Sequence, residues 1–228
     1  KGLLPLHAIR EGEVFGDLNV GIHTDFEFLK LAELVRRSRE IHPGIQLTFI
    51  NSMSTDIILD LRKGQHDVGF FFGPCKSADL QVTQLASVEM AVAGPAAWKN
   101  RIEKAGLAEL AELPWVYTSE RCPFYSHTSS LFAETGMDIN KRVFVDSEDA
   151  IRNLVKTEVG IAVLRKQDAV QAEREGWGFV WEGEVSPISL NMAVPGRRMR
   201  EPLIMAWTEL VRECWPTPAA PLNQLEIG

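Results

Sequence analysis

The stretch from Gly16 to Phe72 most constrains the fold, because strand and helix patterns alternate along it. Apolar residues alternate with polar residues or glycine over 18–22 and again over 45–49, as they do in period-two strands. The run 68–72 is continuously apolar, which indicates a strand covered on both faces. The order strand, helix, strand, helix, strand predicts one half of a parallel α/β sheet.

Two helices are expected between these strands. In the first, apolar residues recur at helical spacing from residue 28 to 35, arginines occupy the last turn, and Pro43 with Gly44 ends it. The second helix begins after Ser54 or Thr55, either of which is suited to be its N-cap, and ends at Gly64. Polar residues therefore stand at both strand-to-helix junctions, where sheets of this kind bind small molecules.

The rest of the chain repeats this architecture. The two halves are joined by strands near 85–93 and 188–194, so we expect two small α/β lobes with two crossings, a cleft between them and hinge closure over a ligand. The patterns predict further strands at 115–117, 142–145, 161–164 and 179–181, and helices at 126–134, 147–157, 166–175 and 203–214.

Composition narrows the function classes. The 228 residues are 45% hydrophobic and 24% charged, as in a globular protein of one large or two small domains. The net charge of -7 argues against nucleic-acid binding by this chain itself, which would need a clustered positive surface. No run of about 20 apolar residues predicts a membrane span. Because the chain starts with Lys1 and not Met, we expect a fragment or processed product.

Catalytic and metal-binding patterns are weak. The sequence lacks the nucleophile elbow, the phosphate-binding loops and the zinc-protease motif, and no cofactor or metal is expected. Cys122 and His127 lie close in sequence, but zinc normally needs four ligands, and loop residues without chemistry are the better interpretation of this pair. Cys75, Cys122 and Cys214 are expected to be free thiols, although the sequence also allows one disulfide between two of them.

Two segments resemble one family. GDLNVGIHTDFEFLKLAELVRRSREIHPGIQLTFINSMSTDIILDLRKGQHDVGFFFG and FVDSEDAIRNLVKTEVGIAVLRKQ are similar to the effector-binding domain of LysR-type transcriptional regulators, over roughly residues 12–213. The sequence departs from the family at Glu158 and Val159, where a small residue or glycine usually precedes the Gly-Ile-Ala strand.

The resemblance implies a two-lobed type II periplasmic-binding-protein-like fold, with two Rossmann-like subdomains joined by two crossover strands. Lobe I would comprise residues 16–90 and 190–214, and lobe II residues 91–189. Residues 1–15 would end a linker from a winged helix-turn-helix that precedes Lys1 and alone binds DNA, and residues 215–228 would form a loose tail. The implied partners are a small-molecule effector and a second copy in a homodimer, within a tetramer of the full-length, cytoplasmic protein.

The resemblance also implies the ligand site. One side of the ligand site would comprise the two strand-to-helix junctions of the first half, residues 23–25 and 51–55. In the second junction, Ser54 stands where relatives often have a ligand-binding Thr. Each residue also has a structural interpretation: Ser54 or Thr55 as a helix cap, Asp25 as a dipole partner that would disfavour an anionic effector unless a cation lies between, and the others as packing. The expected ligand-binding residues are His23, Thr24, Asp25, Ser52, Ser54, Thr55, Thr118, Ser119, Cys122, Pro123 and Phe124.

Three function classes remain at this point. A ligand-sensing domain of a transcription regulator, without enzymatic activity, agrees best with the linker-like start and the two-lobe spacing. A secreted solute-binding protein of a transporter and an enzyme on the same architecture are the alternatives. A signal peptide or lipoprotein cysteine upstream of Lys1 would favour the transporter protein, and turnover of a bound metabolite would favour the enzyme.

Overall fold

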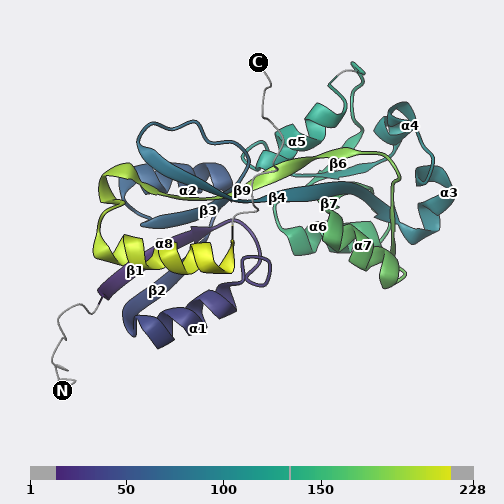
Figure 1. Ribbon diagram of the computed structural model, residues 1–228. Helices are drawn as coiled ribbons and strands as arrows, with labels where there is room; N and C mark the ends of the chain where they lie inside the picture. Colours follow the sequence, from purple (N-terminus) through teal and green to yellow (C-terminus); the bar gives the residue numbers. More distant parts are fainter. Residues whose placement is uncertain (1–13, 134, 217–228) are drawn as a thin grey trace, which may run out of the picture.

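The computed structural model describes residues 14–133 and 135–216, in which one mixed sheet and a separate strand pair carry helices on both sides (Figure 1). The larger sheet has the order β2-β1-β3-β9-β4-β7, with β8 also paired to β4, and β5 pairs with β6. The strands are β1 (Phe15–Ile22), β2 (Gly44–Asn51), β3 (Val68–Phe72), β4 (Leu80–Pro95), β5 (Trp115–Tyr117), β6 (Lys141–Phe144), β7 (Ala162–Arg165), β8 (Gly178–Val180) and β9 (Val185–Pro195). The helices are α1 (Leu31–Ile41), α2 (Ser54–Lys63), α3 (Lys99–Ile102), α4 (Leu107–Glu112), α5 (Pro123–Leu131), α6 (Glu148–Lys156), α7 (Lys166–Arg174) and α8 (Pro202–Cys214), with 3-10 turns η1 (Ala96–Trp98) and η2 (Gly196–Arg198).

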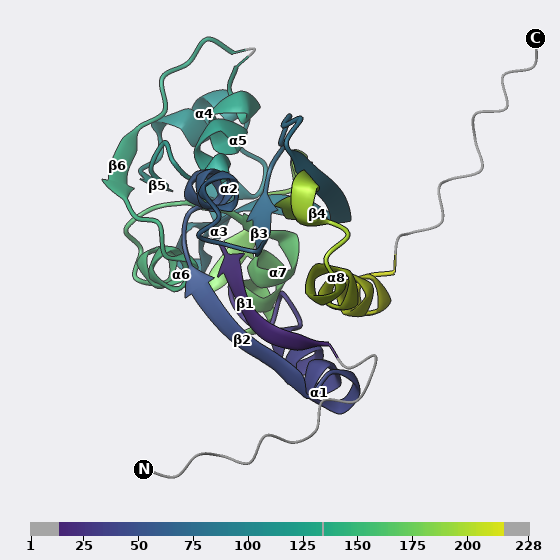
Figure 2. The same cartoon turned by 90° about the vertical axis from the view of Figure 1, so that its left-hand side faces the viewer.

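The elements gather in two groups. Strands β1, β2 and β3 with helices α1, α2 and α8 lie at one end of the molecule, and α3 to α7 with β5 to β8 lie at the other (Figures 1 and 2). The long strands β4 and β9 run through both groups and pair with each other from Leu80↔Pro195 to Met90↔Val185. The two groups are thus joined by two neighbouring strands, the connection around which a hinge can bend.

The predicted order of the first elements is confirmed. β1 pairs in parallel with both β2 and β3, so the carboxyl ends of these strands meet at one sheet edge. All residues of β3 are buried, as the continuous apolar run predicts. The first helix begins later than expected, because Lys30 adopts the left-handed conformation with φ 55° and α1 starts only at Leu31.

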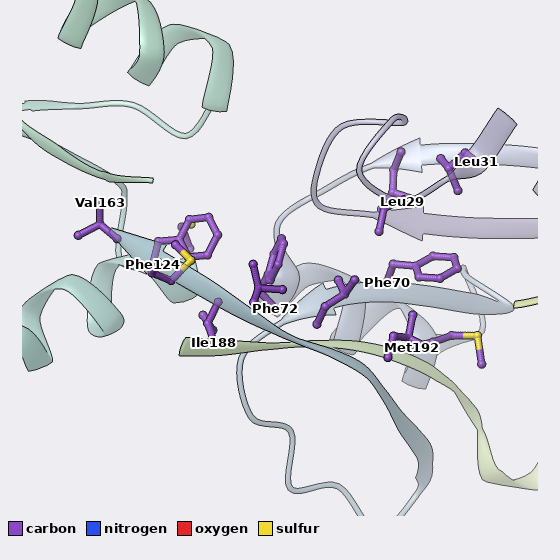
Figure 3. Packing of buried hydrophobic residues seen from close by; sticks show 14 of the residues in the cluster. Leu29, Leu31, Phe70, Phe72, Phe124, Val163, Ile188 and Met192 are labelled. Atoms are coloured by element: carbon purple, nitrogen blue, oxygen red, sulfur yellow. The ribbon is translucent and has the colours of Figure 1, made fainter. Parts of the chain in front are cut away.

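One buried hydrophobic cluster continues through both groups of elements. Figure 3 shows it passing from Leu29, Phe70 and Met192 through Phe72 to Phe124 and Val163. Phe72 ends β3 and Phe124 lies in the first turn of α5, and their ring centroids are 5.1 Å apart. The two groups therefore contact each other through packed aromatic rings as well as through β4 and β9. Among the described helices, none is long and apolar enough to cross a membrane.

Candidate functional site

The two polar junctions of the first half lie side by side, as predicted. His23 follows β1, and its Nδ1 is hydrogen-bonded to the hydroxyl of Ser54 at the start of α2. The Ser54 hydroxyl also accepts a hydrogen bond from the backbone N–H of Phe72 at 3.0 Å. Ser54 is 2% exposed, so both bonds are shielded from water.

The expectation that Ser54 or Thr55 caps α2 is wrong. The N-cap position belongs to Met53, and no side chain caps this helix. The Ser54 hydroxyl is instead used to join β3 and the end of β1, and the Thr55 hydroxyl donates to the backbone oxygen of Arg121 at 3.0 Å. Ser52 contributes its backbone N–H to Ile22 at 2.9 Å.

His23 and Cys122 contact each other across the two groups of elements. The Cys122 sulfur lies 3.8 Å from His23 Nε2, and the ring of Phe124 lies beside the imidazole. Burial lowers the pKa of His23 to about 4 and raises the pKa of Cys122 to about 11. At neutral pH both groups are therefore uncharged, and the thiol is not an activated nucleophile.

A buried ionic contact between the two groups of elements is made by Arg165, the last residue of β7. Its guanidinium is buried, with 3% of the side chain exposed, and donates from Nη2 to Asp25 at 2.6 Å and from Nη1 to Thr24 at 3.3 Å. On its own side, Nε donates to Asp168 at 2.6 Å and Nη2 lies 3.0 Å from Glu148 Oε2. The Thr24 hydroxyl in turn donates to Glu148 Oε1 at 2.8 Å.

The expectation that Asp25 is a dipole partner at a helix start is wrong, because α1 begins only at Leu31; Asp25 instead binds the turn before that helix and faces the other group of elements. Its Oδ1 accepts from the backbone N–H of Phe28 at 2.6 Å, and its Oδ2 faces Arg165. Burial raises the pKa of Asp25, but the Phe28 N–H and the Arg165 guanidinium together outweigh burial and hold that pKa below its usual value. Asp25 alone would repel an anionic effector. The Arg165 guanidinium lies against its carboxylate and compensates that charge.

Burial raises the pKa of Glu148, and the nearby carboxylates of Asp25 and Asp168 act in the same direction. Arg165 and the Thr24 hydroxyl oppose this change. The net effect of these groups is a pKa of Glu148 above its usual value.

The second half contributes buried hydroxyl groups. Thr118 and Ser119 follow β5, and the Oγ atoms of both are buried without a hydrogen-bond partner among the described residues. The backbone N–H of Ser119 donates to Asp146 at 2.8 Å. Pro123 occupies the first turn of α5 and lines a separate hollow of about 390 Å³ with Gly73 and His127.

A hollow of about 1050 Å³ opens beside Arg165. Asp25 is the one predicted ligand-binding residue in its wall, because His23, Ser54, Cys122 and Phe124 are packed beneath the surface. Trp215, which the sequence assigned to a loose tail, also lines it and stacks under Lys30, whose Nζ lies 4.4 Å from the ring centroid. The further wall residues are Glu27, Phe28, Arg152, Asn153, Lys156, Gln167, Asp168, Gln171, Glu175 and Trp177.

Sequence reasoning missed Arg165 and Asp168 and interpreted Glu148 as a helix-dipole carboxylate alone. A usable signal was present, since Arg165 is a charged residue directly after the apolar strand 161–164, at a strand-to-helix junction like that of Thr24 and Asp25. All three cysteines are free thiols. In the described part of the chain, no group of three histidine, cysteine or acidic residues could hold a metal ion.

Comparison with known proteins identifies the class. Residues 11–215 match the family model of the LysR substrate binding domain. The effector binding domain of QuiR in complex with shikimate aligns with a TM-score of 0.73 at 18% identity, covering 89% of this chain and 98% of that one. The regulatory domain of Synechocystis PCC6803 CcmR in complex with 2-PG aligns at 0.75 and 13%, covering 88% and 98%. Full-length CbnR complexed with target DNA aligns at 0.68 and 17%, covering 90% and 73%. No curated protein sequence matches.

The family match spans most of the chain, and the fold is the two-lobed type II periplasmic-binding-protein-like fold that the resemblance implied. The chain belongs to the LysR substrate binding domain family. It is the ligand-sensing domain of a LysR-type transcriptional regulator, and the transporter alternative is not supported.

Proposed function

We propose that this domain binds its small-molecule coinducer where the two lobes meet, at the face formed by Thr24, Asp25, Glu148 and Arg165. The observation that supports this location is Arg165 itself. A buried guanidinium from one lobe binds the strand-to-helix junction of the other, so a ligand entering there must change contacts that hold the lobes together. Differential affinity for the two arrangements would then shift their populations.

The proposed site divides the predicted residues by role. The side chains of Thr24, Asp25 and Thr55 contact the opposite lobe, and those of Thr118 and Ser119 carry buried hydroxyl groups without a described partner; we assign the ligand contacts to these five residues. The others lie beneath and support them, since their polar groups already bond within the protein or are packed in the core. This supporting group comprises His23, Ser52, Ser54, Cys122 and Phe124, whereas the half-buried Pro123 lines the separate hollow beside α5.

We further propose that the bound molecule is not converted. The buried thiol and imidazole that contact each other are both uncharged at neutral pH, and neither is activated for nucleophilic attack. Magnetic resonance spectra of a ligand recovered after prolonged incubation should therefore be unchanged.

For the full-length regulator we propose a homodimer of sensor domains, assembled into a tetramer in the cytoplasm, with DNA contacted only through the winged helix-turn-helix expected before Lys1. Apolar side chains exposed at the start of β1, in the turn before α1, at the end of α1 and on β2 support association of two copies: Phe15, Phe26, Ile41 and Ile50 are 60%, 56%, 52% and 37% exposed. Sedimentation of the domain should show a dimer, and Phe26→Ser with Ile41→Ser should shift it toward monomer.

The lobe boundaries at 90/91 and 189/190 are proposed on the same resemblance.

The site is tested by substitution of Thr24. A thermal-shift screen of metabolites identifies a ligand, because a molecule that binds only the native state raises the melting temperature. Thr24→Val removes the hydroxyl that bonds Glu148 and Arg165 while keeping the shape, and we expect the affinity of that ligand to fall by roughly tenfold in calorimetry.

The matched control is Thr48→Val on the exposed face of β2, which should leave the affinity within about twofold. Equal affinity of wild type and Thr24→Val would remove this face of the cleft from the site. Ser54→Ala is a poor test of ligand contact, since it would also remove the hydrogen bonds to Phe72 and His23.

A further inference from the structure

Two hollows adjoin each other beside α7, where the lobes meet. The hollow of about 1050 Å³ beside Arg165 and a second one of about 470 Å³ have part of their walls in common. Gln171 of α7 lines the first hollow and Val170 the second, so both run along the same helix. Together the two hollows form an interlobe groove, whose shared wall residues are Phe28, Arg165, Gln167 and Trp215.

Contacts with residues of lobe I fix Trp215 in the wall of this groove. Its backbone N–H donates to the backbone oxygen of Val211 at 2.8 Å, at the end of α8. Its ring lies edge-on to Phe28, with 6.1 Å between the ring centroids, and Lys30 lies over it. The next residue, Pro216, is exposed. The chain that follows Trp215 therefore starts at the groove itself.

The sequence beyond this point suits an extended apolar contact. Residues 217–228 read TPAAPLNQLEIG and lie outside the described residues. Pro218 and Pro221 have the spacing of P-x-x-P segments, which favour the polyproline II helix and bind grooves lined by aromatic side chains. Leu222, Leu225 and Ile227 add apolar side chains. At about 3.1 Å per residue, six residues of such a helix extend over roughly 19 Å, which is longer than the nine residues of α7 at about 1.5 Å each.

The groove offers a surface that matches this segment. Three aromatic residues, Phe28, Trp177 and Trp215, line the larger hollow, and Val170 lines the smaller one. The charged residues in the wall of the larger hollow balance, because four are acidic and four are basic. A balanced wall attracts no strongly charged partner, and Glu226 is the one charged side chain of residues 217–228.

We propose that residues 217–228 bind the interlobe groove of the same molecule, with residues 218–221 against the rings of Trp177 and Trp215. The attachment to Trp215 supports this occupant, because a short tether gives a local concentration on the order of millimolar, at which a weak contact is enough. Proline also limits the conformational freedom that is lost on docking.

The docked segment begins on lobe I and contacts α7 of lobe II. It therefore acts as a strap that favours the observed arrangement of the lobes. This inference goes beyond the proposed function, since the contact forms without a coinducer.

A spin label on the segment tests this contact in the full 228-residue chain. Asn223→Cys provides the attachment point, and Cys75→Ser removes the half-buried native thiol, whereas Cys122 and Cys214 are buried. Paramagnetic broadening of amide signals then reports which surface lies near the label. We expect strong broadening for residues 167–171 of α7 and weaker broadening for the exposed side of α8. The amide signals of α2, which packs on the opposite face of the sheet from α8, should be unchanged.

The matched control keeps the label and the length of the segment but removes the features that dock. It combines Pro218→Gly, Pro221→Gly, Leu222→Ser and Leu225→Ser, and it leaves every described contact of the domain in place. In this variant the preference of the broadening for α7 over α8 should be lost. Hydrogen exchange of the α7 amides should also become faster, because the strap no longer covers them.

Equal broadening of α7 and α8 by the unaltered segment, or the same preference for α7 in the glycine and serine variant, would reject the groove as the docking site. A further sample mixes isotope-labelled chains that carry no spin label with spin-labelled chains that carry no isotope. Broadening of residues 167–171 in that mixture would mean that the segment comes from a second copy, and it would overturn the contact within one molecule. These results do not depend on Thr24→Val, so the ligand site is tested separately.

Discussion

At the scale of single residues, the centre of the domain depends on groups whose charge is suppressed by burial. His23 is 7% exposed, bonded to Ser54 and enclosed by Phe72, Phe124 and Cys122. An imidazolium here would lose its hydration without gaining a carboxylate in contact, and the more distant Asp146 only partly opposes this. The neutral ring can be treated as part of the packed core, and protonation acts against the fold.

This makes the stability of the domain sensitive to acid. The pKa of His23 is about 4 in the folded state and about 6.5 when unfolded, so between these values the unfolded chain binds more protons and the free energy of unfolding rises with pH. Between pH 4 and 6.5, His23 alone should raise the free energy of unfolding by roughly 3 kcal/mol. His23→Asn should flatten the profile from pH 4 to 6.5 in urea titrations. An equally steep profile in the variant, or a His23 ring that titrates near pH 6.5 in magnetic resonance spectra, would contradict the assignment.

The sequence could place the residues of the first lobe but not the ion pairs between lobes. His23, Thr24 and Ser54 are fixed by the ends of adjacent parallel strands, which a pattern of alternating residues reveals. Arg165 reaches Asp25 from 140 positions away in sequence, and that distance is bridged only by the packing of two lobes. Local periodicity contains no information on such a contact.

At the scale of elements, short segments and ends were harder to predict than central strands and helices. The helices α3 and α4 contain four and six residues, too few for a helical period to be recognised, and were not predicted. The strand β4 extends over 16 residues, well beyond the expected 85–93, because its first part pairs with β9 whatever its own pattern. Tertiary pairing here overrides local preference.

The departure from the family at Glu158 has a structural consequence at the end of α6. Glu158 adopts φ 64°, its N–H donates to Val155 at 3.1 Å, and the N–H of Val159 donates to Leu154 at 3.0 Å. This is the Schellman arrangement, in which glycine is preferred because a side chain strains the left-handed backbone. The side chain of Glu158 is exposed. The family's usual small residue at this point therefore has a conformational reason, separate from any effect of charge on the ligand site.

Glu158→Gly should therefore stabilise the domain. Relief of the left-handed strain should raise the free energy of unfolding by about 1 kcal/mol, measured by urea denaturation. Glu158→Ala is the control, since it removes the same charge but keeps a Cβ in the strained conformation, and it should change stability by less than about 0.5 kcal/mol. Equal gains from both substitutions would show that charge, and not backbone conformation, limits stability here.

At the scale of the whole molecule, two kinds of contact hold the lobes in the observed arrangement. β4 and β9 connect them covalently, and the packed rings of Phe72 and Phe124 with the Arg165 contacts close the space between. The ionic contacts are not equivalent. Arg165 is buried, whereas Arg121, which pairs with Asp56 across the same gap, has 65% of its side chain exposed. Water screens the Arg121 pair, so the Arg165 contact should contribute more to closure.

This difference predicts which acidic residue controls the opening of the lobes. Asp25→Asn retains an oxygen for the Phe28 N–H but removes the charge that faces Arg165, and about 1 kcal/mol of closure should be lost, after allowance for the 37% exposure of the Asp25 side chain. The ratio of open to closed molecules then rises about fivefold. Small-angle X-ray scattering should report a larger radius of gyration, and hydrogen exchange should quicken at the start of α6. Asp56→Asn breaks the exposed pair with Arg121 and should change neither measurement. Identical scattering of Asp25→Asn and wild type would mean that the aromatic packing, and not Arg165, keeps the lobes closed.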